Sequence, residues 1–101
     1  MDTIIDRFGI TYTVTRTPLS ANAVAYYAFA DGFPVARAVL RLDKGCINDV
    51  LVYRKADRHR GIATALYDLI EGELGRPLRA SRIRMRSKAG RAFWASRVAD
   101  R

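Results

Sequence analysis

The chain has 101 residues, half of them apolar, and a formal net charge of +8. This length supports one small domain, residues 1–101, with enough apolar residues for a hydrophobic core. No apolar run approaches the roughly 20 residues that span a bilayer, and the short acidic N-terminus excludes a secretory signal. The single cysteine, Cys46, cannot form an internal disulfide, and no Cys or His spacing suits a metal. We therefore expect a cytoplasmic protein without a metal or a membrane partner.

The positive charge lies entirely in the second half of the chain. Residues 1–53 carry five Lys or Arg and five Asp or Glu, whereas residues 54–101 carry thirteen and five. This asymmetry favours a polyanionic partner, whether a phosphorylated cofactor, a nucleic acid or an acidic protein. The alternative is an arginine-rich surface that serves solubility alone.

Four runs in the first half have the composition and period of β-strands. They are residues 10–14, 24–29, 35–42 and 47–53. Residues 18–22 are expected to break the first strand. Asp31-Gly32 is a hairpin signal, and Lys44-Gly45 marks a further turn. Successive strands with short connections predict an antiparallel sheet.

The hydrophobic period changes to that of a helix after residue 61. The apolar positions of one helix face are Ile62, Leu66, Leu69, Ile70 and Leu74. Gly75 is placed to end this helix, and Pro77 prevents its continuation. Residues 78–81 are compatible with a short strand, and Ser87 predicts the N-cap of a last helix. The predicted order is β-β-β-β-α-(β)-α, which is an α+β or mixed α/β fold.

The connection between the fourth strand and the helix reads Arg58-His-Arg-Gly61-Ile-Ala63. A glycine turn that opens a helix directly after a strand collects backbone N–H groups and the positive end of the helix dipole around one anion. Basic residues on both sides of the turn strengthen that interpretation. The alternative is a simple strand–helix turn in which Gly61 is a steric necessity.

This stretch, preceded by Asp49-Val-Leu-Val-Tyr53, resembles the acyl-CoA motif of the GNAT superfamily of N-acetyltransferases. The family signature is Arg/Gln-x-x-Gly-x-Gly/Ala, and Arg58, Gly61 and Ala63 fill its three fixed places. The resemblance covers about residues 24–98. It implies a GNAT-like domain with a central, mostly antiparallel sheet and acetyl-CoA as co-substrate.

The resemblance also implies which residues bind the cofactor. The N–H groups of residues 59–64 would hold the pyrophosphate, and the backbone of residues 51–53 would pair with the pantetheine arm like an added strand. A serine in place of the family's asparagine would cap the last helix and touch the cofactor. The implied cofactor-binding residues are Leu51, Val52, Tyr53, Arg58, His59, Arg60, Gly61, Ile62, Ala63, Thr64 and Ser87.

Two positions carry the catalytic chemistry that the resemblance implies. Many family members place a carboxylate twelve residues before the motif glycine, and that position is Asp49, the candidate base. The alternative role for Asp49 is a hydrogen-bonding turn residue after Asn48. The family's usual acid is a tyrosine, and Trp94 stands in its place. An indole N–H donates a hydrogen bond but gives up no proton at useful pH, so the proton for the leaving thiolate would come from elsewhere or from solvent, or would not be needed.

The chain is shorter than the family pattern at two places. Only residues 17–23 are available where family members carry two acceptor-side helices, and the two strands that follow the last helix are missing. A sheet without those strands has an exposed edge, which predicts a homodimer or a tight protein partner.

Other candidate residues have competing interpretations. A nucleophilic pair of Cys46 and His59 is disfavoured, because Cys46 at a strand entrance is expected to be packed. An array of arginines could meet the adenosine 3′-phosphate or a nucleic-acid backbone, or form a solvated basic edge. Its members are Arg82, Arg84 and Arg86. Four aromatic residues are expected in core and hairpin packing rather than in base stacking. They are Tyr26, Tyr27, Phe29 and Phe33.

The leading hypothesis is therefore an acyl-CoA-dependent N-acyltransferase that acetylates an amine, such as a protein lysine or N-terminus. The alternative is a catalytically inactive GNAT-fold binding protein whose basic C-terminal half engages nucleic acid or a macromolecular target.

Overall fold

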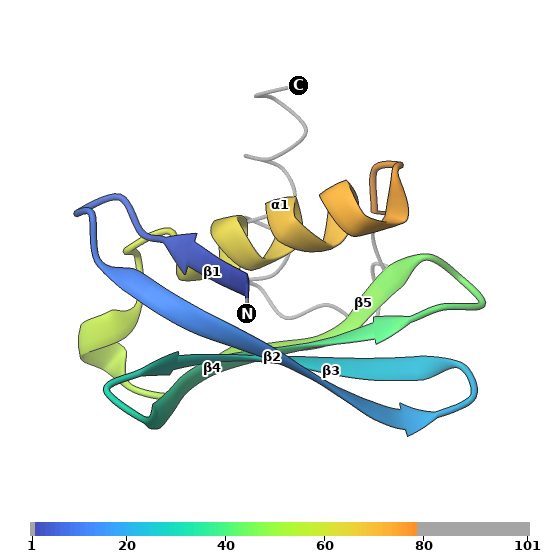
Figure 1. Cartoon of the computed structure of the whole chain (residues 1–101), viewed down its shortest axis with the longest axis horizontal. Coiled ribbons are helices and arrows are strands. Elements are labelled where there is room, and N and C mark those ends of the chain that lie inside the picture. The colour runs from blue at the N-terminus through green and yellow to red at the C-terminus, as the bar shows by residue number, and fades with distance from the viewer. Residues whose placement is uncertain (1, 79–101) are drawn as a thin grey trace.

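The computed structural model describes residues 2–78, which form a five-stranded antiparallel sheet with one α-helix packed on one face (Figure 1). The elements are β1 Asp2–Ile5, β2 Thr11–Ser20, β3 Ala23–Ala30, β4 Phe33–Arg41, β5 Cys46–Val52, the 3-10 helix η1 Lys55–Asp57 and α1 Ile62–Leu74. The predicted mixed class and antiparallel sheet are confirmed. Of the expected strand at residues 78–81 only Leu78 is described, and it is not in a strand; the expected last helix lies outside the described residues. A bilayer-spanning helix is absent from residues 2–78, where the longest helix has 13 residues.

Tight turns make the sheet a meander in the order β1-β2-β3-β4-β5. Asp31 and Gly32 both have positive φ, +52° and +83°, between paired strands β3 and β4. Two positive φ angles are the mark of a type I′ turn, whose twist matches that of the flanking strands. Residues 21 and 22 join β2 directly to β3, so the chain forms no helix there, as predicted.

The structure corrects two sequence-based expectations about strands. β1 is an additional strand, and β2 continues through Pro18 to Ser20 where residues 18–22 were expected to break it. β1 pairs only with residues 11–14, so the second half of β2 is an edge on that side. A proline without an N–H is tolerated at such an edge, and the pairing shifts register between Pro18 and Ser20.

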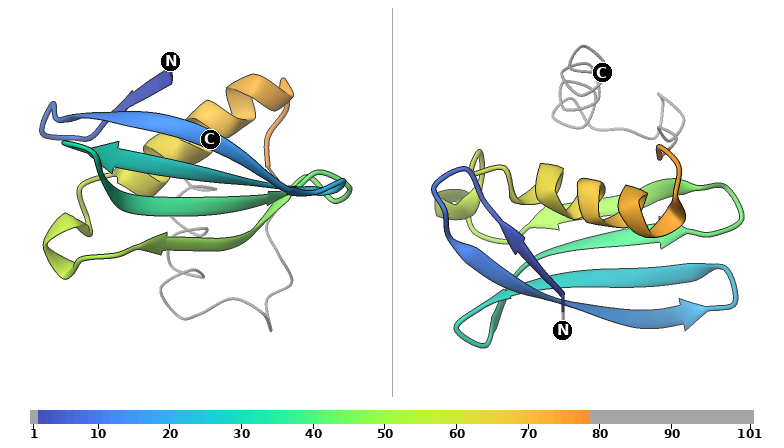
Figure 2. Two further views of the ribbon diagram at one scale, coloured as in Figure 1. Left: turned by 60° about the horizontal axis from the view of Figure 1, so that its bottom comes forward. Right: turned by 45° about the horizontal axis from the view of Figure 1, so that its top comes forward.

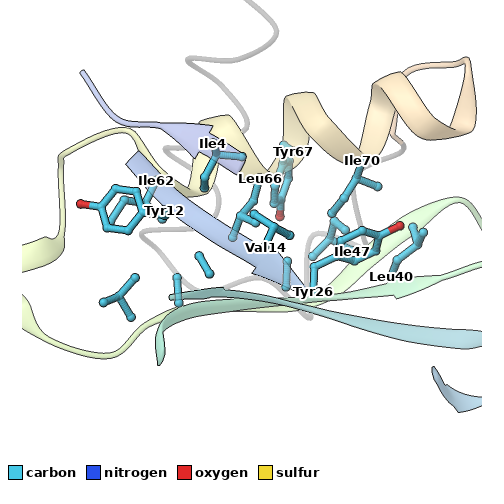
Figure 3. Packing of buried hydrophobic residues seen from close by; sticks show 14 of the residues in the cluster. Ile4, Tyr12, Val14, Tyr26, Leu40, Ile47, Ile62, Leu66, Tyr67 and Ile70 are labelled. Carbon is cyan, nitrogen blue, oxygen red and sulfur yellow. The ribbon is translucent and has the colours of Figure 1, made fainter. Parts of the chain in front are cut away.

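The core lies between α1 and one face of the sheet (Figure 3). α1 buries Ile62, Leu66, Tyr67 and Ile70, which confirms the predicted helix face, while Leu69 and Leu74 are partly buried against the core. The sheet contributes alternate residues, as its period of two requires. The buried sheet residues of this layer include Ile4, Tyr12, Val14, Tyr26, Ala28, Ala36, Ala38, Leu40 and Ile47.

The four aromatic residues that were expected in core and hairpin packing lie in different environments in the structure. Tyr26 is buried in the core, whereas Tyr27 and Phe29 are half-buried on the opposite face of the sheet, with ring centroids 6.4 Å apart. Phe33 is 73% exposed, so the expectation of hairpin packing is wrong for this residue. Alternation along β3 and the tight turn after it account for this difference.

A cluster of polar side chains fastens the C-terminal half of α1 to the sheet. The Glu73 carboxylate accepts hydrogen bonds from the Tyr26 hydroxyl at 2.7 Å and from Arg16 Nε at 3.1 Å. Arg16 also pairs with Asp2 on β1, and its guanidinium lies 5.4 Å from the centre of the Tyr26 ring. The cluster therefore joins β1, β2, β3 and α1.

Candidate anion-binding site

The connection from β5 to α1 has a backbone shaped by two residues with positive φ. Arg58 is extended, with φ −76° and ψ 155°, and His59 has φ +63°, which is the combination of a type II turn. Gly61 then takes the left-handed conformation at φ +87°, and α1 begins at the next residue. A Cβ at residue 61 would lie in ordinary contact with Arg7 at 3.8 Å. Glycine is therefore favoured here by its backbone conformation and not by lack of space.

The backbone amides of this turn are the groups available to an anion. Residues 2–78 provide no hydrogen-bond acceptor for the N–H groups of His59 and of residues 61–64. The first helical hydrogen bond runs from the Ala65 amide to the Gly61 carbonyl, at 3.0 Å. The unused amides lie at the N-terminal end of α1, where the helix dipole is positive. This arrangement is suited to a phosphate or another anion.

The side chains of the first turn of α1 leave this end accessible. Ile62 points into the core and is 1% exposed, so only its amide can serve a ligand. Ala63 is half-buried and small, and Thr64 is exposed. A ligand that approaches the amides therefore meets no bulky side chain from these three residues.

The arginines of the motif contact the protein backbone. Arg60 Nε donates to the Ala56 carbonyl at 3.2 Å, and the Arg60 guanidinium lies 5.7 Å from the centre of the Phe8 ring. Arg58 Nε lies 3.4 Å from the Val52 carbonyl. His59 is exposed. The two arginines therefore contact carbonyls that precede the turn in the chain, and neither of these contacts involves the amides of the turn.

The charge of the connection is positive. Residues 54–61 contain four Lys or Arg and a single carboxylate, Asp57. The buried Asp57 carboxylate accepts a hydrogen bond from Arg54 Nε at 2.9 Å, so its negative charge is paired. The surplus cations raise the local potential, and an anionic ligand is attracted to this end of the molecule.

Only one of the three residues expected to pair with a pantetheine arm turns its backbone outward. The Tyr53 amide donates to the Val35 carbonyl at 3.0 Å, so Ala36 and Val52 form a non-hydrogen-bonded pair. The backbone groups of Val52 therefore face the outer edge of β5. Those of Leu51, which pairs with Arg37, and of Tyr53 face β4. No strand of residues 2–78 pairs with this outer edge.

Asp49 lies within β5 and is held by an arginine. Its Oδ2 accepts hydrogen bonds from Arg37 Nε at 3.0 Å and Nη2 at 2.9 Å. The neighbouring pair Ala38 and Val50 packs into the core, so Asp49 lies on the sheet face away from α1. The pairing shifts register between Val39 and Leu40, which places the irregularity at Asn48 and leaves Asp49 in the strand. The alternative role of Asp49 as a turn residue is wrong.

Two expected site residues, Ser87 and Trp94, lie outside the described residues. Cys46 is buried, as expected for a packed residue.

Asp6, which was not among the residues predicted from the sequence, contacts the turn from the side of the β1–β2 loop. Its buried carboxylate accepts hydrogen bonds from the amides of Phe8 and Ile10, both at 2.9 Å, and from the Tyr12 hydroxyl at 2.8 Å. Arg60 Nη1 lies 3.9 Å from Asp6 Oδ2. Burial alone would raise the pKa of Asp6, but these hydrogen bonds and the Arg60 charge outweigh it and lower the pKa. The spacing of Asp6 and Gly9 is the signal of an Asx-type turn that could have revealed it.

The fold and the site define a small α+β domain with a strand–turn–helix element suited to an anion. No protein-family model matches the sequence, and neither the curated proteins nor the solved structures give a significant match. The relation to the GNAT superfamily therefore remains a prediction from the motif.

Proposed function

We propose that this domain binds the pyrophosphate of an acyl-CoA at the N-terminal end of α1 and transfers an acetyl group to an amine, such as a protein lysine or N-terminus. The proposal is supported by the amides of His59 and residues 61–64, which donate to no acceptor within residues 2–78 and lie in a turn that contains Gly61. A pyrophosphate needs several donors at close range, and this turn offers them next to a positive helix end.

The acyl-transfer chemistry places separate demands on the side chains. The attacking amine must lose a proton, and the departing thiolate must gain one. Asp49 is the candidate base, and its ion pair with Arg37 means that a proton would reach it only after this arginine is displaced or through water. Trp94, which stands in the place of the family's tyrosine, would supply a hydrogen-bond donor but no acid at neutral pH. The leaving thiolate would then be protonated by solvent.

Calorimetry with acetyl-CoA tests the binding step on the full chain. Gly61→Glu places a carboxylate at the amides, and Gly75→Glu is its matched control. Gly75 also has positive φ, +71°, and caps the opposite end of the same helix. We expect micromolar binding by the wild type, at least about tenfold weaker binding by Gly61→Glu, and no change in Gly75→Glu. Absence of binding by the wild type would refute the proposal.

The second candidate is a catalytically inactive protein of the same fold that engages nucleic acid. The Arg37–Asp49 ion pair favours it, because the candidate base is occupied by a cation. Retention on DNA or RNA that falls steeply with salt, together with no acetyl-CoA binding, would support this alternative.

A further inference from the structure

The loop between β1 and β2 is organised around one carboxylate. The Asp6 side chain has no exposed surface and receives the three hydrogen bonds from Phe8, Ile10 and Tyr12. The backbone of Asp6 adds two more, because its amide donates to the Ile10 carbonyl at 3.0 Å and its carbonyl accepts from Gly9 at 3.1 Å. One side chain thus fixes the shape of residues 6–10.

This loop touches the anion-binding turn through backbone atoms. The two connections lie at the same end of the sheet in every view (Figures 1 and 2). The Arg7 amide donates to the Arg60 carbonyl at 2.8 Å. The Arg60–Gly61 peptide is planar and trans, so the Gly61 N–H points opposite to the Arg60 carbonyl. The hydrogen bond from Arg7 therefore directs the Gly61 amide away from the β1–β2 loop.

The side chain of Arg60 makes the same connection a second time. Its guanidinium stacks near Phe8 and approaches the Asp6 carboxylate, while its Nε is held by Ala56. Arg60 is thus fastened to the loop through its carbonyl and through its guanidinium. Movement of the β1–β2 loop would carry the turn with it.

We propose that Asp6 is a positioning residue for the anion-binding turn. Its carboxylate holds the β1–β2 loop, the loop holds the Arg60 carbonyl, and the carbonyl sets the direction of the Gly61 amide. The contribution of Asp6 to ligand binding rests on the proposed function. Its effect on the orientation of the turn does not, because that effect is present without a ligand.

Backbone NMR of the full chain tests the orientation of the turn. Asp6→Asn is compared with Asp43→Asn, which makes the same chemical change in the β4–β5 turn, where Asp43 pairs with Arg41. We expect Asp6→Asn to shift the amide resonances of Gly61 and Ile62, and Asp43→Asn to leave them in place. Unshifted resonances in a folded Asp6→Asn protein, or equal shifts in both variants, would overturn the inference. Tyr12→Phe, which removes one of the three hydrogen bonds, replaces Asp6→Asn if that variant does not fold.

Titration of the same proteins with pyrophosphate and with coenzyme A tests the effect on binding. Loss of one well-oriented donor to a charged ligand is expected to weaken both affinities about tenfold in Asp6→Asn. Asp43→Asn should bind as the wild type does. Equal affinities in the wild type and Asp6→Asn contradict the positioning role. A wild type that binds neither ligand refutes the proposed function, and the NMR comparison still decides whether Asp6 orients the turn.

Discussion

Arg37 on β4 and Asp49 on β5 are diagonal neighbours across the strand pair, with two guanidinium nitrogens within 3.0 Å of one carboxylate oxygen. Both side chains are partly exposed, so this pair adds little to stability, and its importance is for chemistry. If Asp49 accepts the proton from the amine, Asp49→Asn should lower the transfer rate by about 10²–10⁴-fold. Acetyl-CoA affinity should be unchanged, since the amides lie elsewhere.

The Asp49 prediction is checked by a steady-state assay with acetyl-CoA and an amine acceptor. Asp43→Asn is the control, because that carboxylate is also paired with an arginine but lies in the β4–β5 turn. Equal rates in Asp49→Asn and the wild type would exclude Asp49 as the base.

Gly61 and Gly72, at the start and in the interior of α1, should respond to alanine in opposite directions. Gly61→Ala forces a side chain into positive φ and is expected to lower the free energy of unfolding by about 1–2 kcal/mol. Gly72 has open space where a Cβ would stand, with no neighbouring atom within 4 Å, so Gly72→Ala should raise it by about 0.5–1 kcal/mol. Urea denaturation measures both. A loss in Gly72→Ala would contradict the prediction.

Leu66 should be among the most costly positions to truncate. Its side chain is fully buried between α1 and the sheet, as Figure 3 shows. Leu66→Ala is expected to cost about 2–5 kcal/mol of unfolding free energy. Leu19, which is 55% exposed on β2, is the control, and Leu19→Ala should stay within about 0.5 kcal/mol. Similar losses in both variants would argue against the core described above.

Acid should weaken the domain partly through Asp6. Because the pKa of Asp6 is lower in the folded state, its stabilisation is complete above the unfolded pKa of about 3.9 and is lost as pH falls through the folded pKa. The groups that face it are the Tyr12 hydroxyl, the Phe8 and Ile10 amides and Arg60. Thermal melts across this range should show a shallower loss of Tm in Asp6→Asn.

Asp43 contributes to acid sensitivity with the same sign, because hydrogen bonds from Arg41 lower its pKa. Asp43→Asn is therefore melted alongside Asp6→Asn, to compare the loss of Tm in acid that each carboxylate causes. An acid profile of Asp6→Asn that matches the wild type would show that Asp6 carries none of the effect.

The outer edge of β5 leads us to propose a homodimer or a tight protein partner, whose pairing there would compete with a pantetheine arm along Val52. No strand within residues 2–78 covers that edge, and exposed edges are commonly paired. Sedimentation velocity at micromolar concentration should show a dimer of the isolated chain. Leu51→Lys, on β5, should weaken it, whereas Leu19→Lys, on β2, should not. A monomer in the wild type would leave only a different protein as the partner.

The part of the fold that could be predicted is the part encoded locally. The apolar period from Ile62 to Leu74 and the glycine that follows define α1 by themselves, and its bounds are confirmed. Asp31-Gly32 likewise defines its own turn. β1 could not be predicted, because a four-residue strand has no period to detect and exists only through its pairing with β2.

The position of the candidate site could be predicted from the sequence, but the contacts that hold its turn in place could not. The pattern Arg58-x-x-Gly61-x-Ala63 locates the turn, yet the two arginines contact backbone carbonyls that only the folded chain brings near. The outward direction of the Val52 backbone depends on the register between β4 and β5, and this register could not be predicted from the sequence. The contact between Arg7 and Arg60 spans most of the described chain and carries no local signal.

The order of elements also affects how the protein is made. The hairpins of a meander can pair one after another as the polypeptide leaves the ribosome, since each strand contacts the one synthesised just before it. Their apolar face, with Tyr12, Val14 and Tyr26, stays uncovered until α1 emerges. Nascent chains should therefore depend on chaperones until Leu74 has left the ribosome, because exposed apolar sheet surface promotes aggregation.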